Sequence, residues 1–389
     1  MVYRSVLVVG AGLAGAVHAR QLAETGLHVQ VIDARLHIAG NAYDETGPDG
    51  IRIHRYGPHL FHTANTRVLD YVRRYATWEP YTHRVRALLP SGALAPLPIN
   101  LDTINAVTGL RLETEAQVRA HLASVSVPIA EPANAAEYLA SKIGIQLRDL
   151  FFRPYTKKMW NLDLEDMDAA VVKRLPLRYD RLDTYFPEDQ TQILPRDGYT
   201  AFVGEILNHS GIEIALETRF EHRLMREFDF CFASLPIDEY YEFREGELPY
   251  RSIRFHHRSE NRDAAGSVWG GLHGTDFSVV NFTDGGPYTR ETAWHRLPNH
   301  TSRETRRVTF TREEPCDYRA NNYERYYPVR SADGANAANY ERYRALAERD
   351  REHIAFIGRC GTYRYLDMDQ VINQSLMGVT HWLSERGLG

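Results

Sequence analysis

The chain has 389 residues, 43% of them hydrophobic and 25% charged, with a formal net charge of −5. This length exceeds one ordinary hydrophobic core, so we expect two or three domains. The acidic balance argues against a general nucleic-acid binder.

No apolar run approaches the roughly 20 residues of a membrane span, and Arg4 and Gly10 interrupt the first apolar segment. We therefore expect neither a membrane span nor a secretory signal. The cysteines, Cys231, Cys316 and Cys360, lack the spacing of a metal site or of a disulfide framework. We expect no metal, a reducing compartment and a cytoplasmic location.

The first 33 residues predict a strand over 5–9, a glycine turn, a helix over 14–25 and a second strand over 28–32. The turn has the spacing G-x-G-x-x-G, with Gly10, Gly12 and Gly15, and Asp33 follows the second strand. In a dinucleotide site these glycines admit a pyrophosphate to the helix N-terminus, and the acid accepts hydrogen bonds from ribose hydroxyls. We therefore expect a dinucleotide cofactor, the alternative being a tight turn with no ligand.

The segment after Asp33 predicts a strand near 51–54 and a loop rich in polar rings, YGPHLFHT, at 56–63. The two histidines of this loop, three residues apart, have a helix start as their alternative interpretation. Further along, the pattern favours a helix over 65–76, strand-like pieces over 80–98 and a largely helical stretch over 100–152.

The sequence from 163 to 185 mixes acids and bases with few apolar residues, which predicts an exposed loop carrying Lys173, Arg174 and Arg178. Beyond it we expect a helix over 201–208 and a strand over 228–233 that returns to the nucleotide sheet. Short strands over 252–255, 278–282 and 307–310 predict an antiparallel sheet. A strand ending at Gly358 and Arg359 precedes the C-terminal helix, and Arg359 suits a pyrophosphate.

Several motifs occur together and in a fixed order: GAGLAG at 10–15, YGPHLFHT at 56–63, LPIN at 97–100, YTKKMW at 155–160, KRLP at 173–176, YRS at 250–252, PYTR at 287–290, YYP at 326–328 and GRCGTYRYLDMD at 358–369. By these motifs the chain resembles the UDP-galactopyranose mutase family along nearly its whole length.

The resemblance implies an α/β fold with three parts. They are a discontinuous Rossmann-like FAD-binding domain (1–80, 200–240 and 330–389), a mainly helical domain (81–165), and a mobile loop with an antiparallel sheet that holds substrate (166–199 and 241–329). It also implies that UDP-galactopyranose and UDP-galactofuranose are interconverted through an adduct between the sugar and N5 of reduced FAD. An external reductant is then a partner, and a homodimer is left open.

The resemblance assigns the substrate site residue by residue. Arg174 and Arg290 would hold the diphosphate, because a guanidinium binds two phosphate oxygens. Phenol hydroxyls and aromatic faces would complete the site, and the remaining substrate contacts are Phe152, Tyr155, Thr156, Trp160, Tyr185, Tyr327, Tyr365 and His83.

The catalytic set implied by the resemblance is Arg174, Arg290, His59, His62 and Asp367. The implied cofactor contacts come from both ends of the chain: Gly10, Gly12, Leu13, Ala14, Gly15, Asp33, Ala34, Gly40, Asn41, His59, Arg359, Tyr365, Asp367 and Met368.

The chain departs from the family's pattern at three positions. Ala39 replaces the first glycine of a usual Gly-Gly-Asn, His83 replaces a usual asparagine near the sugar, and Trp294 stands in an altered run after Arg290. These changes leave open a mutase that acts on a different nucleotide-hexopyranose. An amine-oxidase-type flavin oxidoreductase and a catalytically silent UDP-binding relative are further alternatives.

Overall fold

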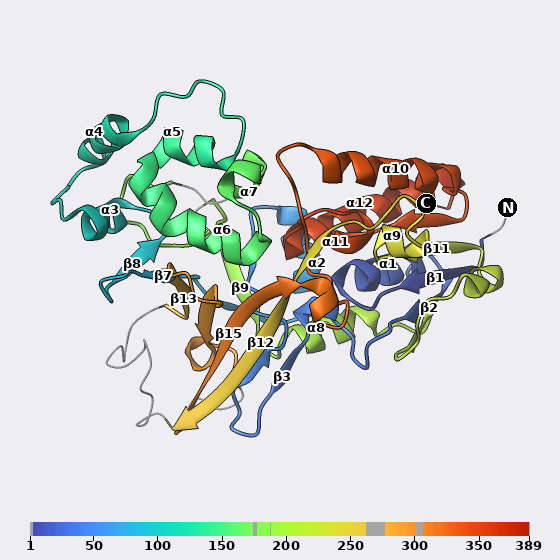
Figure 1. The fold of residues 1–389 in the computed structure, drawn as a ribbon. Helices are drawn as coiled ribbons and strands as arrows, with labels where there is room; N and C mark the ends of the chain where they lie inside the picture. The colour runs from blue at the N-terminus through green and yellow to red at the C-terminus, as the bar shows by residue number, and fades with distance from the viewer. Residues whose placement is uncertain (1–2, 174–176, 187, 262–276, 301–305, 389) are drawn as a thin grey trace.

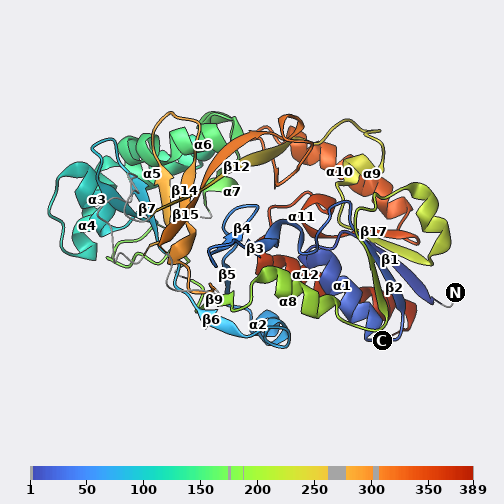
Figure 2. The same cartoon turned by 90° about the horizontal axis from the view of Figure 1, so that it is seen from below.

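The computed structural model describes residues 3–173, 177–186, 188–261, 277–300 and 306–388. A parallel αβ unit lies at one end and a group of helices at the other, and a large sheet with two long strands lies between them (Figures 1 and 2). Arg174, a predicted substrate and catalytic residue, lies outside the described residues.

The αβ unit is built on a five-stranded parallel sheet. Its strand order is β10 (Ile212–Ala215), β2 (His28–Ile32), β1 (Ser5–Val9), β11 (Phe230–Ala233) and β17 (Ile354–Phe356). The central position of β1 and the return of β11 beside it confirm the predicted Rossmann-like arrangement.

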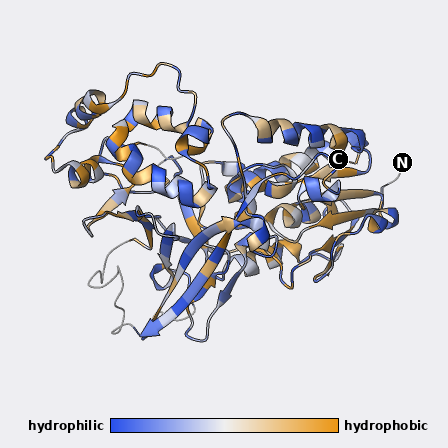
Figure 3. Cartoon of the chain, viewed as in Figure 1, coloured by the Kyte–Doolittle hydropathy of each residue, from blue (hydrophilic) through white to orange (hydrophobic). Residues whose placement is uncertain are grey.

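Both faces of this sheet are covered, which explains why β1 is a continuous apolar run. Val6 and Val8 pack into one core with the helices of that face, and Leu7 and Val9 pack into another core on the opposite face. The sheet strands are accordingly coloured hydrophobic in Figure 3. The helices of this unit are α1 (Leu13–Ala23), α2 (Thr66–Arg73), α8 (Tyr199–Leu207), α9 (Ile237–Tyr240), α10 (Ala335–Arg349), α11 (Gly358–Gly361) and α12 (Met368–Arg386).

The large sheet contains seven strands in the order β16 (Tyr327–Pro328), β12 (Tyr250–Asn261), β15 (Arg307–Asp317), β14 (Arg290–Ala293), β13 (Val279–Phe282), β7 (Val85–Leu88) and β8 (Leu94–Leu97). Its pairs are antiparallel, as the sequence predicts, except that β13 and β7 run parallel. β7 and β8 join this sheet although they fall within the range 81–165; the residue boundaries of the three domains remain a prediction.

The helical group consists of α3 (Leu101–Thr108), α4 (Glu115–Val125), α5 (Ala135–Leu147), α6 (Arg153–Trp160) and α7 (Ala169–Val172). Leu164, Met167 and Val172 are buried in its core. The expectation of a uniformly exposed loop is therefore wrong for this part of the segment 163–185, because these apolar side chains need cover.

Two small sheets link the larger units: β3 (Asp44–Thr46) with β4 (Arg52–His54), and β5 (Phe61–Thr63) with β9 (Thr191–Pro195) and β6 (Trp78–Pro80). His62 lies in β5 and His59 lies in the turn before it, so a helix start at these histidines is wrong. In the described ranges, no helix is both long and apolar enough to cross a membrane, and no cluster of acidic, histidine and cysteine side chains could hold a metal ion.

A buried histidine of α1 makes the stability of the αβ unit depend on pH. His18 is 1% exposed, and its Nδ1 donates to the Ala14 carbonyl oxygen over 2.9 Å. Burial lowers the pKa of His18 from 6.5 to about 4. Below pH 6.5 the unfolded chain binds a proton that the folded chain excludes, so this contribution to stability is lost as the pH falls toward 4.

We predict that His18→Leu flattens the pH dependence of unfolding. From pH 8 to pH 5 the wild type should lose roughly 2 kcal/mol more than the variant, because a single shifted histidine contributes that difference. Urea unfolding followed by tryptophan fluorescence at the two pH values measures it. Equal losses in the two proteins would contradict the assignment of a neutral, buried His18.

Candidate active site

A cavity of about 700 Å³ lies where the αβ unit, the large sheet and the helical group meet. Most of the predicted substrate and catalytic residues line it, although they come from distant parts of the chain: His59, His62, His83, Tyr155, Trp160, Tyr185, Arg290, Tyr327, Tyr365 and Asp367. Arg359 and Met368, predicted as cofactor contacts, line it as well. The sequence motifs therefore converge on one cavity.

Arg290 is the first residue of β14, and a residue of the neighbouring strand, β15, holds its side chain. Its cross-strand partner is Glu313 of β15, and Nε of Arg290 donates to Oε2 of Glu313 over 2.8 Å. Burial acts against the charge on Arg290, but Glu313 outweighs it, so the pKa of Arg290 lies well above its usual value. A partly buried cation with a buried counter-charge stays protonated and fixed, as an anion site requires.

A second arginine and two tyrosine rings form the next part of the wall. Nη2 of Arg359 donates to the Leu366 carbonyl oxygen over 2.6 Å, and the guanidinium lies 5.3 Å from the ring centre of Tyr327 and 4.9 Å from that of Tyr365. The two rings are stacked, with centres 5.3 Å apart. Burial raises the pKa of Tyr327, so its hydroxyl stays protonated and can donate to an anion.

The histidines of the cavity differ in their environment. Burial lowers the pKa of His59 to about 3, and burial together with Arg290 lowers that of His83 to about 3, so both are neutral at physiological pH. Nδ1 of His59 donates to the Gly57 carbonyl oxygen over 2.9 Å. Nδ1 of His62 instead meets a carboxylate, that of Asp189, at 2.5 Å.

The predicted substrate contacts on and before α6 line the cavity only in part. Tyr155 and Trp160, on α6, line the cavity, and Phe186 adds a further ring. Phe152 packs against the core of the helical group, and Thr156 is buried at 4% exposure; neither belongs to the residues that line the cavity.

The glycine turn has the close contacts that a dinucleotide site requires. Gly10 has φ +105°, and a Cβ on Gly15 would lie 1.8 Å from the Gly10 carbonyl oxygen, so only glycine fits there. Within the described chain no side chain caps the first turn of α1, which leaves its amides for a phosphate. This geometry fits a dinucleotide cofactor.

The remaining predicted cofactor residues surround the same turn. Asp33 accepts from the Ala11 amide over 2.8 Å and from the Arg35 amide over 2.9 Å, so it braces the glycine turn and keeps lone pairs for a ribose. Gly40 lies against Gly12. Leu13 and Ala14 are the first residues of α1, Ala34 is exposed beside Asp33, Asn41 follows Gly40, and Asp367 and Met368 begin α12.

Phe186 and Asp189 line the cavity and Glu313 pairs with Arg290, and none of these three residues was predicted from the sequence. Glu313 becomes recognisable only through the register of β14 and β15. Phe186 directly follows the predicted Tyr185, and that adjacency was the available signal. Asp189 is 127 residues from its partner His62, and no spacing in the sequence joins the two.

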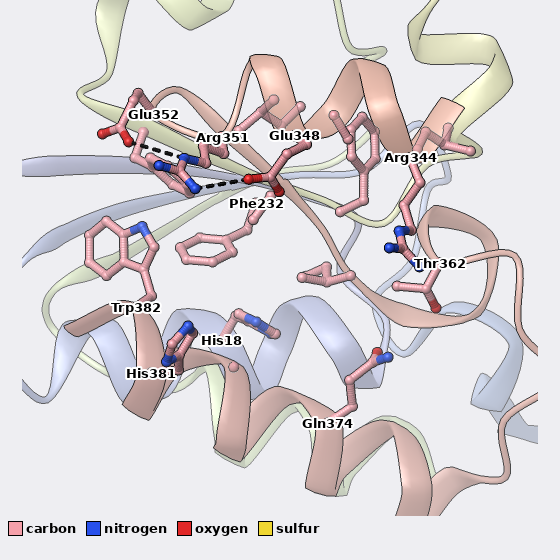
Figure 4. A pocket seen from close by; sticks show the side chains of 18 of the residues that line it. His18, Phe232, Arg344, Glu348, Arg351, Glu352, Thr362, Gln374, His381 and Trp382 are labelled. Carbon is pink, nitrogen blue, oxygen red and sulfur yellow. Dashed lines mark hydrogen bonds and ion pairs between the residues drawn. The ribbon is translucent and has the colours of Figure 1, made fainter. Parts of the chain in front are cut away.

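A larger cavity of about 1070 Å³ lies on the far side of the αβ unit, between α10 and α12. Figure 4 shows Phe232 and Trp382 with His18 on its inner side and the ion pair of Arg351 with Glu348 at its rim. The predicted substrate and cofactor residues do not line this cavity. Its rim charges are paired with each other, so the smaller cavity is the candidate active site.

Comparison with known proteins agrees with the family that the sequence motifs indicate. A family model described as UDP-galactopyranose mutase matches residues 150–365, and one described as an NAD(P)-binding Rossmann-like domain matches residues 8–75. A probable UDP-galactopyranose mutase of Klebsiella pneumoniae is 36% identical over 98% of this chain and 95% of that protein. A dTDP-fucopyranose mutase of Escherichia coli is 35% identical over 95% of this chain and 96% of that protein.

Among solved structures, a reduced UDP-galactopyranose mutase has the same fold, with a TM-score of 0.74 at 15% identity over 99% of this chain and 96% of that one.

Proposed function

Since the chain belongs to the UDP-galactopyranose mutase family, a family of isomerases, we propose that it interconverts the pyranose and furanose forms of a nucleotide-activated hexose. The proposed substrate is UDP-galactose, and the proposed cofactor is FAD in its reduced form. One observation carries the proposal: the cavity joins a charged Arg290, paired with the buried Glu313, to Arg359, the stacked tyrosines and the aromatic rings of α6.

The cofactor would be held by both ends of the chain. The glycine turn and Asp33 suit its pyrophosphate and ribose, and Arg359, Tyr365 and the start of α12 suit the part that reaches the cavity. When bound and reduced, the flavin supplies a nucleophilic nitrogen, N5, to the anomeric carbon of the sugar. An external reductant, a cytoplasmic location and an open choice of monomer or homodimer belong to the proposal.

The chain's own residues would bind and orient the nucleotide sugar. Arg290, fixed on Glu313, neutralises the diphosphate as it departs and returns. The hydroxyls of Tyr185, Tyr327 and Tyr365 donate to phosphate oxygens. The neutral His59 and His83 present polar atoms to sugar hydroxyls without adding charge.

A second substrate deserves a direct test because the dTDP-fucopyranose mutase is nearly as similar to this chain as the Klebsiella relative. The buried His83 lines the cavity where the family's usual residue is asparagine. A buried polar group that is matched to one hydroxyl pattern discriminates strongly against another. A dTDP-linked 6-deoxyhexose is therefore the alternative substrate.

The function is tested by incubating FAD-loaded protein, reduced with dithionite, with UDP-galactopyranose, dTDP-fucopyranose and UDP-glucose, and separating the products by anion-exchange chromatography. We expect a furanose product from at least one of them, with UDP-galactose preferred. The oxidised protein serves as the control and should be inactive. Absence of flavin absorbance after reconstitution, or equal activity of the oxidised protein, would contradict the proposal.

Replacing Arg290 with alanine should weaken UDP binding by about 1.5–3 kcal/mol, or roughly 10- to 150-fold in Kd, because a charge-assisted hydrogen bond is lost. Arg344→Ala is the control, since Arg344 is 66% exposed and pairs with Glu341 on α10. Flavin content and thermal midpoint are compared first, because Arg290 also neutralises Glu313. An unchanged Kd by calorimetry would mean that Arg290 does not hold the diphosphate.

His83→Asn should change the ratio of kcat/KM between UDP-galactose and dTDP-fucose by at least about fivefold, since a lost or gained hydroxyl contact of about 1 kcal/mol has that effect. His256→Asn, at an exposed position on β12, is the matched control. The same ratio in wild type and His83→Asn would remove His83 from the set of specificity residues.

A further inference from the structure

His62 lines the active-site cavity with one of its ring nitrogens already engaged. Its Nδ1 lies 2.5 Å from Oδ2 of Asp189, and its ring stacks on Phe186 with centres 3.6 Å apart and planes 13° apart. The contact of Nδ1 with Asp189 and the stacking on Phe186 therefore fix the orientation of the His62 ring. Only Nε2 is left to meet whatever occupies the cavity.

Asp189 lies in a turn that is itself tied to the sugar end of the site. The Tyr185 amide donates to the His83 carbonyl oxygen over 2.8 Å, and the Gln192 side chain joins the His83 amide to the Phe186 carbonyl oxygen. The Asp189 carboxylate thus reaches His62 from a backbone held at both ends. Among the described residues, His62 is the side-chain partner that the structure gives to this carboxylate.

A carboxylate accepts hydrogen bonds and cannot donate them. When His62 is neutral, its one ring N–H is therefore at Nδ1. Nε2 then carries a lone pair and faces the cavity as an acceptor. His59 reaches the same tautomer in another way, because its Nδ1 donates to a backbone carbonyl oxygen. The two histidines of the YGPHLFHT motif would therefore both offer acceptors to sugar hydroxyls.

We propose that Asp189 is a positioning residue of the mutase reaction, which holds His62 as the Nδ1–H tautomer with Nε2 directed at the sugar. This rests on the proposed function, and it adds a residue that acts on the sugar through His62. The substrate group recognised is a hydroxyl of the hexose, which donates to Nε2.

The partial exposure of Asp189 and His62 distinguishes a role in positioning His62 from a role in stabilising the fold. The Asp189 side chain is 24% exposed and that of His62 is 12% exposed. Water can replace the carboxylate as a partner, so losing it should cost little stability. What is lost is the fixed choice between two tautomers, because without Asp189 either ring nitrogen can carry the proton.

The test uses the FAD-loaded protein with 15N-labelled histidine at pH 8, where histidine side chains are ordinarily neutral. Two-bond 1H–15N spectra distinguish the protonated from the unprotonated ring nitrogen, and the loss of one signal set in His62→Gln assigns His62. We expect Nδ1–H in the wild type and in Asp189→Glu, and a shift toward Nε2–H in Asp189→Ala. Glu314→Ala, which removes the carboxylate at 2.7 Å from Nε2 of His256 outside the cavity, is the matched control and should leave the His62 signals unchanged.

The kinetic arm measures kcat, the Kd of UDP and the thermal midpoint. Asp189→Ala should lower kcat at least tenfold, change the Kd of UDP less than twofold and leave the midpoint unchanged, while Asp189→Glu recovers most of the activity. An unchanged His62 spectrum in Asp189→Ala would overturn the proposal. So would a parallel loss of UDP affinity and thermal stability, which would point to a disturbed turn.

The two proposals fail separately. If the reduced wild type converts no sugar nucleotide, the proposed function is wrong, and the spectra still decide whether Asp189 sets the tautomer of His62.

Discussion

The cavity depends on one ion pair, between a partly buried arginine and a buried glutamate. Arg290 and Glu313 face each other across β14 and β15, and Glu313 is 1% exposed. Burial raises the pKa of Glu313 while Arg290 acts in the opposite direction. Either charge alone would be strongly unfavourable at this place, and together they hold a permanent cation at the cavity wall. The register of two antiparallel strands thus positions the group that a diphosphate needs.

The second constraint is the meeting of the chain's two ends at the glycine turn. Gly358 precedes Arg359, and a Cβ added to it would lie 3.0 Å from the Cβ of Ala14 on α1. The amide of Gly358 donates to the side chain of Gln374 on α12, over 3.1 Å. This close packing brings Arg359 and the start of α12 next to the first strand–turn–helix. One cofactor can therefore be held by residues more than 300 positions apart.

Arginines and two neutral histidines line the cavity, together with the acidic side chains of Asp189 and Asp367. Arg290 is charged and paired with Glu313, and Arg359 donates to the backbone carbonyl oxygen of Leu366. The two histidines are different, because burial keeps His59 and His83 neutral. This division suits a ligand with one anionic and one uncharged end, as a nucleotide sugar has.

The sequence by itself determined the Rossmann-like unit, the family and twelve of the side chains that line the cavity. Glycine spacing and apolar runs are local features, and Gly15, β1 and β2 follow from steric limits within about 30 residues of chain. Tyr155, Arg290, Tyr327 and Arg359 could be named in advance because each belongs to a motif that the family shares, and the resemblance implies its role. Phe152, just before the motif at 155–160, and Thr156, within it, do not line the cavity. Only the tertiary structure decided the parallel pairing of β13 with β7, the ion pair of Arg290 with Glu313 and the contact of Asp189 with His62. Each of these joins residues by strand register or by the path of a turn, and neither leaves a periodic signal in the sequence.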